Sequence, residues 1–267
     1  MYIATWNVNS IRARLDHLIA WLGQHPELDV LCVQETKVVD GDFPVAAIAE
    51  LGWHCAFYGQ KTYNGVAILS RTPLAQVAPG FVPVLGSGAA AWDEQKRLLM
   101  AETAGYRILN LYVPNGSAVG SDKYHYKLEW LALLRQYLEH LNPQTLPLVI
   151  LGDFNVAFTD LDLHDPGDRE QKIMATEAER QAWQGILGLG LLDGFRLFTT
   201  DGGHYTWWDY RGGAFRRNHG WRIDYILISQ WLQDRAIACT IDPTPRHWAQ
   251  PSDHTPVIMH LENWQAA

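Results

Sequence analysis

LPLVILGDFN (Leu146 to Asn155) is the stretch that decides the fold, because an apolar run ends there abruptly in an acid and an amide. The run contains β-branched residues and is introduced by Pro147, which predicts a central strand covered on both faces. If the backbone stays extended, Asp153 and Asn155 point to the same side and Phe154 turns back toward the core. That arrangement would supply two neighbouring polar side chains to a functional site. A plain turn is the alternative, since Gly and Asp commonly end strands, and other parts of the chain must decide.

Size and composition predict one globular α/β domain over residues 1–267. The chain is 48% hydrophobic, ample for a sizeable core, and has no linker, low-complexity tract or tandem repeat. Its apolar stretches are too short to span a membrane and it begins without a charged and apolar leader, so we expect a cytosolic protein without membrane contact. Cys32, Cys55 and Cys239 are widely spaced and odd in number, which favours reduced thiols over disulfides or a zinc site.

The distribution of charge is more informative than its sum. A net charge of −8 argues against a protein that binds nucleic acid through bulk positive charge. However, the segment RGGAFRRNHGWR, from Arg211 to Arg222, carries arginines and no acid. It is either a solvated loop or a surface that faces phosphates. In the second interpretation, Arg211 and Arg222 bind the substrate.

Hydrophobic periodicity predicts several strands and three long helices. The strands are expected at Tyr2 to Trp6, Val30 to Val33, Gly65 to Leu69, Arg107 to Val113, Leu148 to Leu151, Ile223 to Ile228 and Pro256 to Leu261. The helices are expected at Ile11 to Leu22, Lys123 to Leu141 and Glu177 to Leu187. Strands and helices mix without strict alternation, which favours two stacked sheets with helices outside over a doubly wound parallel sheet.

Polar residues stand at the ends of most of these strands. Those that follow a strand are Asn7 and Asn9, Gln34 and Glu35, Tyr112 and Asn115, and Asp153 and Asn155. Those that precede a strand are Asp224, Asp253 and His254. If the last two strands run antiparallel to the others, all these ends meet at one rim of the stacked sheets. Any one of these residues could be a solvated strand end, but turns alone do not easily explain the whole set.

The chemistry of this set selects a hard divalent cation. Several carboxylates with one strongly placed histidine and no thiolate favour Mg²⁺ or Mn²⁺ held by oxygen over Zn²⁺. Glu35 is the best single candidate for a metal ligand, with Asp253 as its helper. A cation there would stabilise the charge that develops on a phosphate and on the leaving oxygen.

The remaining residues suit the hydrolysis of a phosphodiester. Asp153 can accept a proton from water while Asn155 orients that water by hydrogen bonds. His254, held by Asp224, can bind a phosphate oxygen as an imidazolium, because a neighbouring carboxylate raises the pKa of histidine. Further donors are supplied by Asn7, Tyr112 and Asn115.

Four segments resemble the successive motifs of one family. They are DVLCVQETK (Asp29 to Lys37), LGDFN (Leu151 to Asn155), NHGWRIDYILIS (Asn218 to Ser229) and PSDHTPV (Pro251 to Val257). Together they are similar to the exonuclease III family of apurinic/apyrimidinic endonucleases, within the larger group of metal-dependent phosphodiesterases that includes DNase I. The resemblance runs from Asn7 to the C-terminus.

The resemblance implies a four-layered α/β sandwich, with two packed mixed sheets flanked by helices. It also implies Mg²⁺ as the cofactor, with Mn²⁺ as a substitute. The matching roles are metal ligand for Glu35, metal and phosphate neighbour for Asn7, second metal-side acid for Asp253, phosphate contact for Tyr112, water activation and positioning for Asp153 and Asn155, and a phosphate-facing pair for Asp224 and His254.

The resemblance further implies double-stranded DNA with abasic sites or damaged 3′ ends as the substrate, and a monomeric enzyme. Trp207, Trp221 and Ile223 fall where the family builds an apolar pocket for a flipped-out abasic sugar. A sugar without a base is small and easily extruded, whereas a normal nucleotide must lose about a few kcal/mol of stacking and pairing. Two residues depart from the family pattern: Gly194 stands where Ser or Thr is usual, and Leu197 where Lys or His is usual.

Three functions remain open on the sequence alone. The first is an abasic-site endonuclease that cuts 5′ to the lesion and leaves a 3′-hydroxyl, with some 3′→5′ exonuclease or 3′-phosphatase activity. The second is a phosphodiesterase that acts on small phosphoesters or lipid head groups. The third is a DNA-binding relative without catalysis, although a binder has no need of Glu35, Asp153 and His254.

Overall fold

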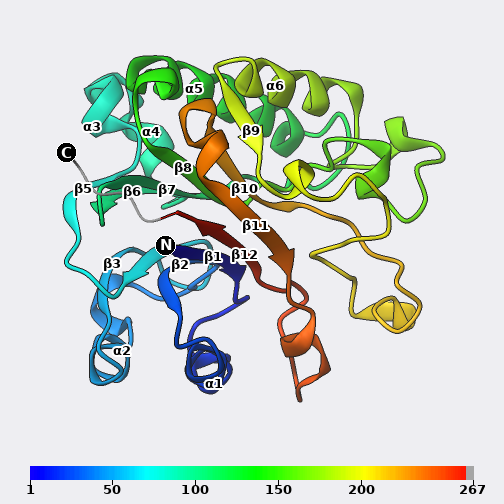
Figure 1. Ribbon diagram of the computed structural model, residues 1–267. Helices are drawn as coiled ribbons and strands as arrows, with labels where there is room; N and C mark the ends of the chain where they lie inside the picture. Colours follow the sequence, from blue (N-terminus) through cyan, green and yellow to red (C-terminus); the bar gives the residue numbers. More distant parts are fainter. Residues whose placement is uncertain (263–267) are drawn as a thin grey trace.

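Two six-stranded sheets form the centre of the protein. The computed structural model describes residues 1–262 (Figure 1). The first sheet has the order β11 (Ala236–Ile241), β12 (Val257–Leu261), β1 (Tyr2–Asn7), β2 (Leu28–Gln34), β4 (Val66–Ser70) and β3 (His54–Tyr58). The second has the order β5 (Ala75–Pro79), β6 (Leu98–Thr103), β7 (Tyr106–Tyr112), β8 (Leu148–Asp153), β10 (Asp224–Ser229) and β9 (Leu191–Asp193). Both sheets mix parallel and antiparallel pairs.

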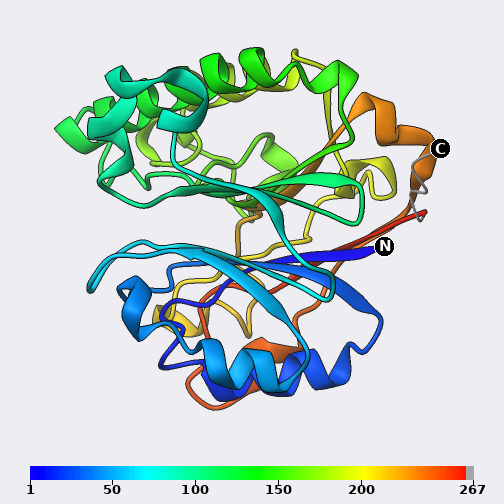
Figure 2. The ribbon, with the colours of Figure 1, turned by 90° about the vertical axis from the view of Figure 1, so that its left-hand side faces the viewer.

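Helices cover the outer face of each sheet, which gives four layers (Figure 2). The first sheet is covered by α1 (Leu15–Gln24) and α2 (Val45–Glu50). The second is covered by α3 (Val82–Leu85), α4 (Ala90–Asp93), α5 (Asp122–Leu141) and α6 (Glu177–Leu187). The expectation of a four-layered sandwich with two mixed sheets is therefore confirmed. No helix among residues 1–262 is long and apolar enough to cross a membrane.

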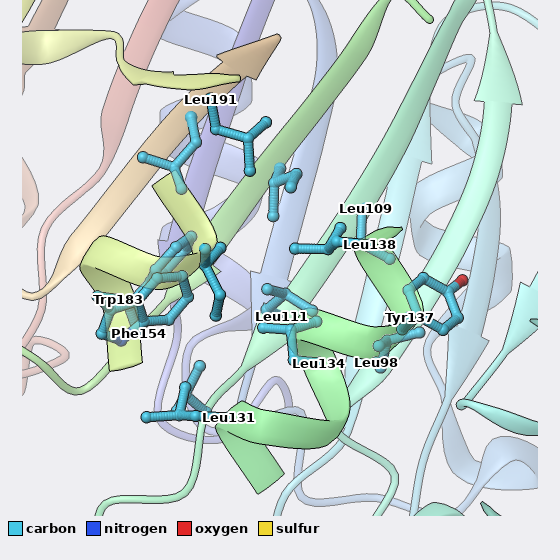
Figure 3. Packing of buried hydrophobic residues seen from close by; sticks show 14 of the residues in the cluster. Leu98, Leu109, Leu111, Leu131, Leu134, Tyr137, Leu138, Phe154, Trp183 and Leu191 are labelled. Carbon is cyan, nitrogen blue, oxygen red and sulfur yellow. The ribbon is translucent and has the colours of Figure 1, made fainter. Parts of the chain in front are cut away.

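Three apolar interfaces separate the four layers. The middle interface packs residues such as Ile3, Ile68 and Val149 between the sheets, all at 0% exposure. On the outer side of the second sheet, Phe154 and Trp183 pack at a ring distance of 4.6 Å (Figure 3). The expected inward position of Phe154 is confirmed. Each sheet is thus buried on both faces, which explains why its central strands read as continuous apolar runs.

A polar link crosses the interface between the sheets. Gln34 donates to Thr5 at 2.9 Å and to Asn110 at 2.7 Å, and Asn110 in turn donates to the backbone oxygens of Val33 and Ala67. Gln34 and Asn110 are fully buried. Gln34 was expected at the rim beside Glu35, and this was wrong: it is the last residue of β2 and points between the sheets. Buried amides that find partners fix the relative register of the two sheets.

Helix ends follow their capping residues. Ser121 caps α5 by accepting from the backbone N–H of Tyr124, and the helix ends at Asn142 in the left-handed conformation, before Pro143. Thr176 begins α6 with a capping box. The first helix was expected from Ile11, but Ile11 lies in a turn and α1 begins at Leu15, so the expected N-terminal boundary was too early.

Candidate active site

Strand direction brings the polar strand ends together. β1 and β2 are parallel, as are β7 and β8, while β12 runs antiparallel to β1 and β10 antiparallel to β8. The antiparallel direction expected for the last two strands is confirmed. In the second sheet, Asp153 pairs in register with Tyr112 on one side and Asp224 on the other. Three candidate side chains therefore stand in one row at the rim.

Asn7 joins the two sheets at the site. Its side-chain amide donates to Glu35 at 2.9 Å and to Asp153 at 2.9 Å, while its oxygen accepts from the N–H of Asn9. Glu35 takes the left-handed conformation with φ 53°, which is uncommon for a residue with a side chain. This turn at the end of β2 aims the carboxylate of Glu35 across the rim toward Asp153.

Lys37 holds the outer oxygen of Glu35. The two charged groups are 2.7 Å apart, and Lys37 also donates to the side-chain oxygen of Asn9. Burial would raise the pKa of Glu35, but Lys37 and Asn7 outweigh burial and lower it. Glu35 is therefore ionised at neutral pH. The motif DVLCVQETK already contained Lys37, but nothing in the sequence pattern gave it a role.

His254 and Asp224 form a buried pair. Nδ1 of His254 lies 2.9 Å from Asp224, and Nε2 lies 3.8 Å from Asp153. Burial would lower the pKa of His254, but the carboxylates of Asp224 and Asp153 outweigh it and raise the pKa to about 10. The imidazolium is therefore the form present at neutral pH, with its Nε2 proton directed toward the rim.

Burial raises the pKa of Asp153. The positive charge of His254 lowers this pKa, while the negative charges of Asp224 and Glu35 raise it further, and the result is about 7. A carboxylate with this pKa can take a proton at neutral pH.

Asn155 does not lie on an extended backbone. The strand ends at Asp153, and Asn155 turns into the left-handed conformation with φ 49°. Its backbone N–H donates to Asp153 at 2.9 Å, its side chain donates to the carbonyl of Val113, and its side-chain oxygen accepts from Asn115. The expected extended geometry was therefore wrong, although Asn155 and Asn115 both lie beside Asp153. Within residues 1–262, the second N–H of the Asn155 side-chain amide has no acceptor and can donate to water.

Tyr112 lies between Glu35 and Arg97. The guanidinium of Arg97 stands over its ring at 4.6 Å. Burial, followed by the negative charge of Glu35, raises the pKa of Tyr112 well above its usual range, so the phenol stays protonated and can donate a hydrogen bond. Beside it is a cavity of about 540 Å³ lined by Arg97, Tyr112, Asn115, Lys123 and Tyr126 among others.

The donor set fits a divalent cation. Among the described residues, Glu35, Asp153 and His254 offer ligand atoms that all lie within 4.8 Å of one another. The two carboxylates are hard oxygen donors of the kind that Mg²⁺ and Mn²⁺ take. Asp253 lies outside this group, because its two oxygens accept from Asn9 and from the indole of Trp207, each at 2.9 Å.

Two tryptophans stand next to the catalytic rim. Trp207 and Trp221 exchange backbone hydrogen bonds, and their rings meet edge to face at 6.2 Å. Trp207 also forms a β-bridge with His254. Ile223 was expected to line the same apolar pocket, but its side chain is only 1% exposed and offers no open surface.

Arg222 does not face a substrate. It is 1% exposed, and its guanidinium is paired with Asp162 at 2.7 Å and with Asp193 at 2.7 Å. The expected phosphate contact of Arg222 was wrong, because Asp162 and Asp193 already neutralise its guanidinium. Arg211, in contrast, lies on the exposed loop that also carries Arg216 and Arg217.

Comparison with known proteins identifies the relatives of this chain. It is 35% identical over 269 residues to exodeoxyribonuclease III of Haemophilus influenzae. The aligned region covers 96% of this chain and 98% of that protein. An AP endonuclease structure from Archaeoglobus fulgidus matches with a TM-score of 0.92 and 39% identity, covering 98% of this chain and 99% of the other.

A second solved structure adds DNA to the comparison. The 3′ phosphatase from Neisseria bound to product DNA hairpin matches with a TM-score of 0.91 and 40% identity, covering 99% of this chain and 100% of the other. The family model described as Endonuclease/Exonuclease/phosphatase family matches residues 4–254, a span that contains the whole rim from Asn7 to His254. The chain therefore belongs to the Endonuclease/Exonuclease/phosphatase family.

Proposed function

We propose that this protein is a metal-dependent DNA repair phosphodiesterase, which cuts 5′ to an abasic site and leaves a 3′-hydroxyl. The observation that carries the proposal is the joining of two parts across the sheets: the Glu35, Asn7 and Asp153 cluster and the His254 and Asp224 pair. The cluster can hold a cation and activate water, and the pair can bind a phosphate oxygen. Relatives named exodeoxyribonuclease III and AP endonuclease support DNA as the substrate.

In this mechanism the phosphate is bound by positive and neutral donors. The imidazolium of His254, held by Asp224, donates from Nε2 to a non-bridging phosphate oxygen. The phenol of Tyr112 donates to a second oxygen, since it stays protonated beside Glu35. Donors fixed before the reaction stabilise the developing charge without having to reorganise.

Asp153 activates water in the same mechanism. Its carboxylate accepts the proton of a water molecule placed in line with the leaving 3′-oxygen, and the free N–H of Asn155 orients that water. Mg²⁺, for which Mn²⁺ would substitute, would be held by Glu35 with Asn7 beside it, and when bound it would neutralise charge on the phosphate and the leaving oxygen. Asp253 would act from outside this group, by holding Asn9 and Trp207.

The substrate is recognised around this centre. Trp207 and Trp221 would receive the extruded abasic sugar beside His254. Arg211 would bind a backbone phosphate from its exposed loop. Asn115, whose side chain donates to Asn155, would lie beside the DNA at the rim. We also propose that residues 1–267 form one catalytic domain, because both sheets share one apolar interface, and that this domain works as a monomer in the cytosol.

The test is incision of a duplex oligonucleotide with one tetrahydrofuran abasic analogue, with Mg²⁺ or with excess EDTA. We expect cutting 5′ to the analogue, only with metal, and no cutting by Asp153→Asn. In parallel, an undamaged duplex measures exonuclease activity and a duplex with a 3′-phosphate measures 3′-phosphatase activity. The 3′ phosphatase from Neisseria is the relative that supports the second activity. Removal of the 3′-phosphate without incision would move the proposal from abasic sites to damaged 3′ ends. No cleavage of any duplex would contradict it.

A further inference from the structure

Lys127 carries a fully buried ammonium in the second turn of α5, on the side that faces the loops after β7 and β8. Its side chain is 0% exposed, and Nζ donates to the carbonyl of Asn155 at 2.7 Å, to the carbonyl of Asn115 at 3.1 Å and to the carboxylate of Glu179. A lysine ammonium has three donors, so all of them are used. Helical periodicity alone places Lys127 in α5 but gives no reason for a charge at this depth.

Glu179 supplies the opposite charge from α6. It is 0% exposed, and besides Lys127 it accepts from the backbone N–H of Met174 and from both the N–H and the hydroxyl of Thr176. Every carboxylate oxygen therefore has a partner. Desolvation offsets much of the attraction within such a pair, so it adds little net stability, whereas removing one partner alone would leave an unpaired buried charge.

The lysine holds two loops that carry proposed site residues. Asn115 follows β7 and Asn155 follows β8, and their side chains are already joined at 3.0 Å. The Asn155 N–H, on the other side of the same residue, donates to Asp153 at 2.9 Å. A Cβ at Gly116 would lie 3.2 Å from the Lys127 side chain, so the loop backbone lies directly against the lysine stem.

We propose that Lys127 is a positioning residue, which fixes the carbonyls of Asn115 and Asn155 and so sets the aim of Asp153 at the attacking water. The inference rests on the function proposed above. The left-handed conformation of Asn155 is uncommon for a residue with a side chain, and a rigid charged donor on its carbonyl holds that conformation in place. Without the donor, the peptide relaxes and the Asn155 N–H turns away from Asp153.

The experiment compares a double variant with a matched control. Lys127→Met with Glu179→Gln removes the donor and leaves no unpaired buried charge. Tyr124→Phe removes another buried contact between the same helices, the 2.8 Å bond from Tyr124 to Thr176, without touching either loop. On the abasic duplex with Mg²⁺, we expect the double variant to lose kcat by about tenfold to a hundredfold with KM within about threefold. Tyr124→Phe keeps the kcat of the wild type.

Hydrogen exchange gives a second readout that does not depend on activity. Exchange of the Asn155 amide should accelerate in the double variant, while amides within β8 stay protected as in the control. If the double variant does not fold, Lys127→Gln with Glu179→Gln, in which a shorter neutral amide replaces the ammonium and no charge is left unpaired, carries the same two expectations. A variant with wild-type kcat, or one whose Asn155 amide stays protected, would overturn the positioning role. Failure of the wild type to cut would instead count against the proposed function.

Discussion

Nε2 of His254 lies 3.8 Å from the carboxylate of Asp153, and the two groups work in opposite protonation states. Both are buried, yet burial decides the pKa of only one of them: it raises that of Asp153, while at His254 two carboxylates outweigh it. The pair thus divides acid and base roles by environment, since one group must lose its proton to work and the other must keep it.

This division predicts a bell-shaped dependence of kcat on pH. Activity should rise as Asp153 loses its proton near pH 7 and fall as His254 loses its proton near pH 10. Asp224→Asn removes the main attraction that keeps His254 charged, so its alkaline limb should move to lower pH. The measurement is single-turnover incision between pH 5 and pH 11. An alkaline limb that stays in place in the variant would show that His254 does not act as an imidazolium.

Metal binding should depend on Glu35. A ligand that binds only the folded protein raises its melting temperature, so Mg²⁺ should raise that of the wild type and excess EDTA should reverse the shift. Glu35→Gln should abolish the shift and lower kcat by about a hundredfold or more. Glu139→Gln, a change on the outer face of α5 at an exposed pair with Arg135, should leave both unchanged. An equal shift in Glu35→Gln would place the cation elsewhere.

At the residue scale, the sequence predicted which residue types gather at the rim but not how each is turned. Nothing in the pattern showed that the arginine before Ile223 would find Asp162 and Asp193, because both partners are distant in sequence. The left-handed turn at Asn155 was equally hidden, since a tertiary network selects it. The pattern alone made Tyr112 a general donor, and the resemblance specified it as a phosphate contact. Only the resemblance gave Trp207 and Trp221 a role.

At the scale of elements, continuous apolar runs identified the central strands, and the strands that were missed lie mostly at edges. β3, β5 and β11 are partly exposed along much of their length and carry no clear pattern. β6 is buried, but its two-residue turn into β7 uses Ala104 and Gly105, with φ 50° and 81°. Asn-Gly is the usual sequence for such a turn, so the hairpin was not recognised.

Gly152 in β8 leaves no room for a side chain. A Cβ at this position would lie 1.9 Å from the carbonyl oxygen of Leu111 on β7, at φ 144°. Gly152→Ala should therefore lower the free energy of unfolding by at least about 3 kcal/mol. Gly23→Ala is the matched control: it lies within α1 with nothing within 4 Å, and it should stabilise by about 0.5 to 1 kcal/mol. Urea unfolding of both variants decides, and equal stability would show that β7 and β8 can move apart.

At the scale of the whole molecule, a net charge of −8 requires that positive charge be local where DNA binds. Arg216 and Arg217 are exposed on the same loop as Arg211. Replacing Arg216 and Arg217 by Ala should raise KM for the abasic duplex with little change in kcat. The slope of log affinity against log salt should flatten by about 1.8, if each arginine contacts one phosphate. Arg135→Ala is the control, and an unchanged slope would remove this loop from the DNA interface.

The first and last described strands are neighbours, since β1 pairs with β12 and the backbones of Met1 and Leu261 exchange hydrogen bonds. The first sheet therefore stays incomplete until residues 257–261 have left the ribosome, and contacts so distant in sequence form late. A nascent chain that already contains Glu35 and Asp153 still lacks His254. A product cut short before His254 thus lacks both the strand that pairs with β1 and a proposed site residue, and we expect it to show no nuclease activity.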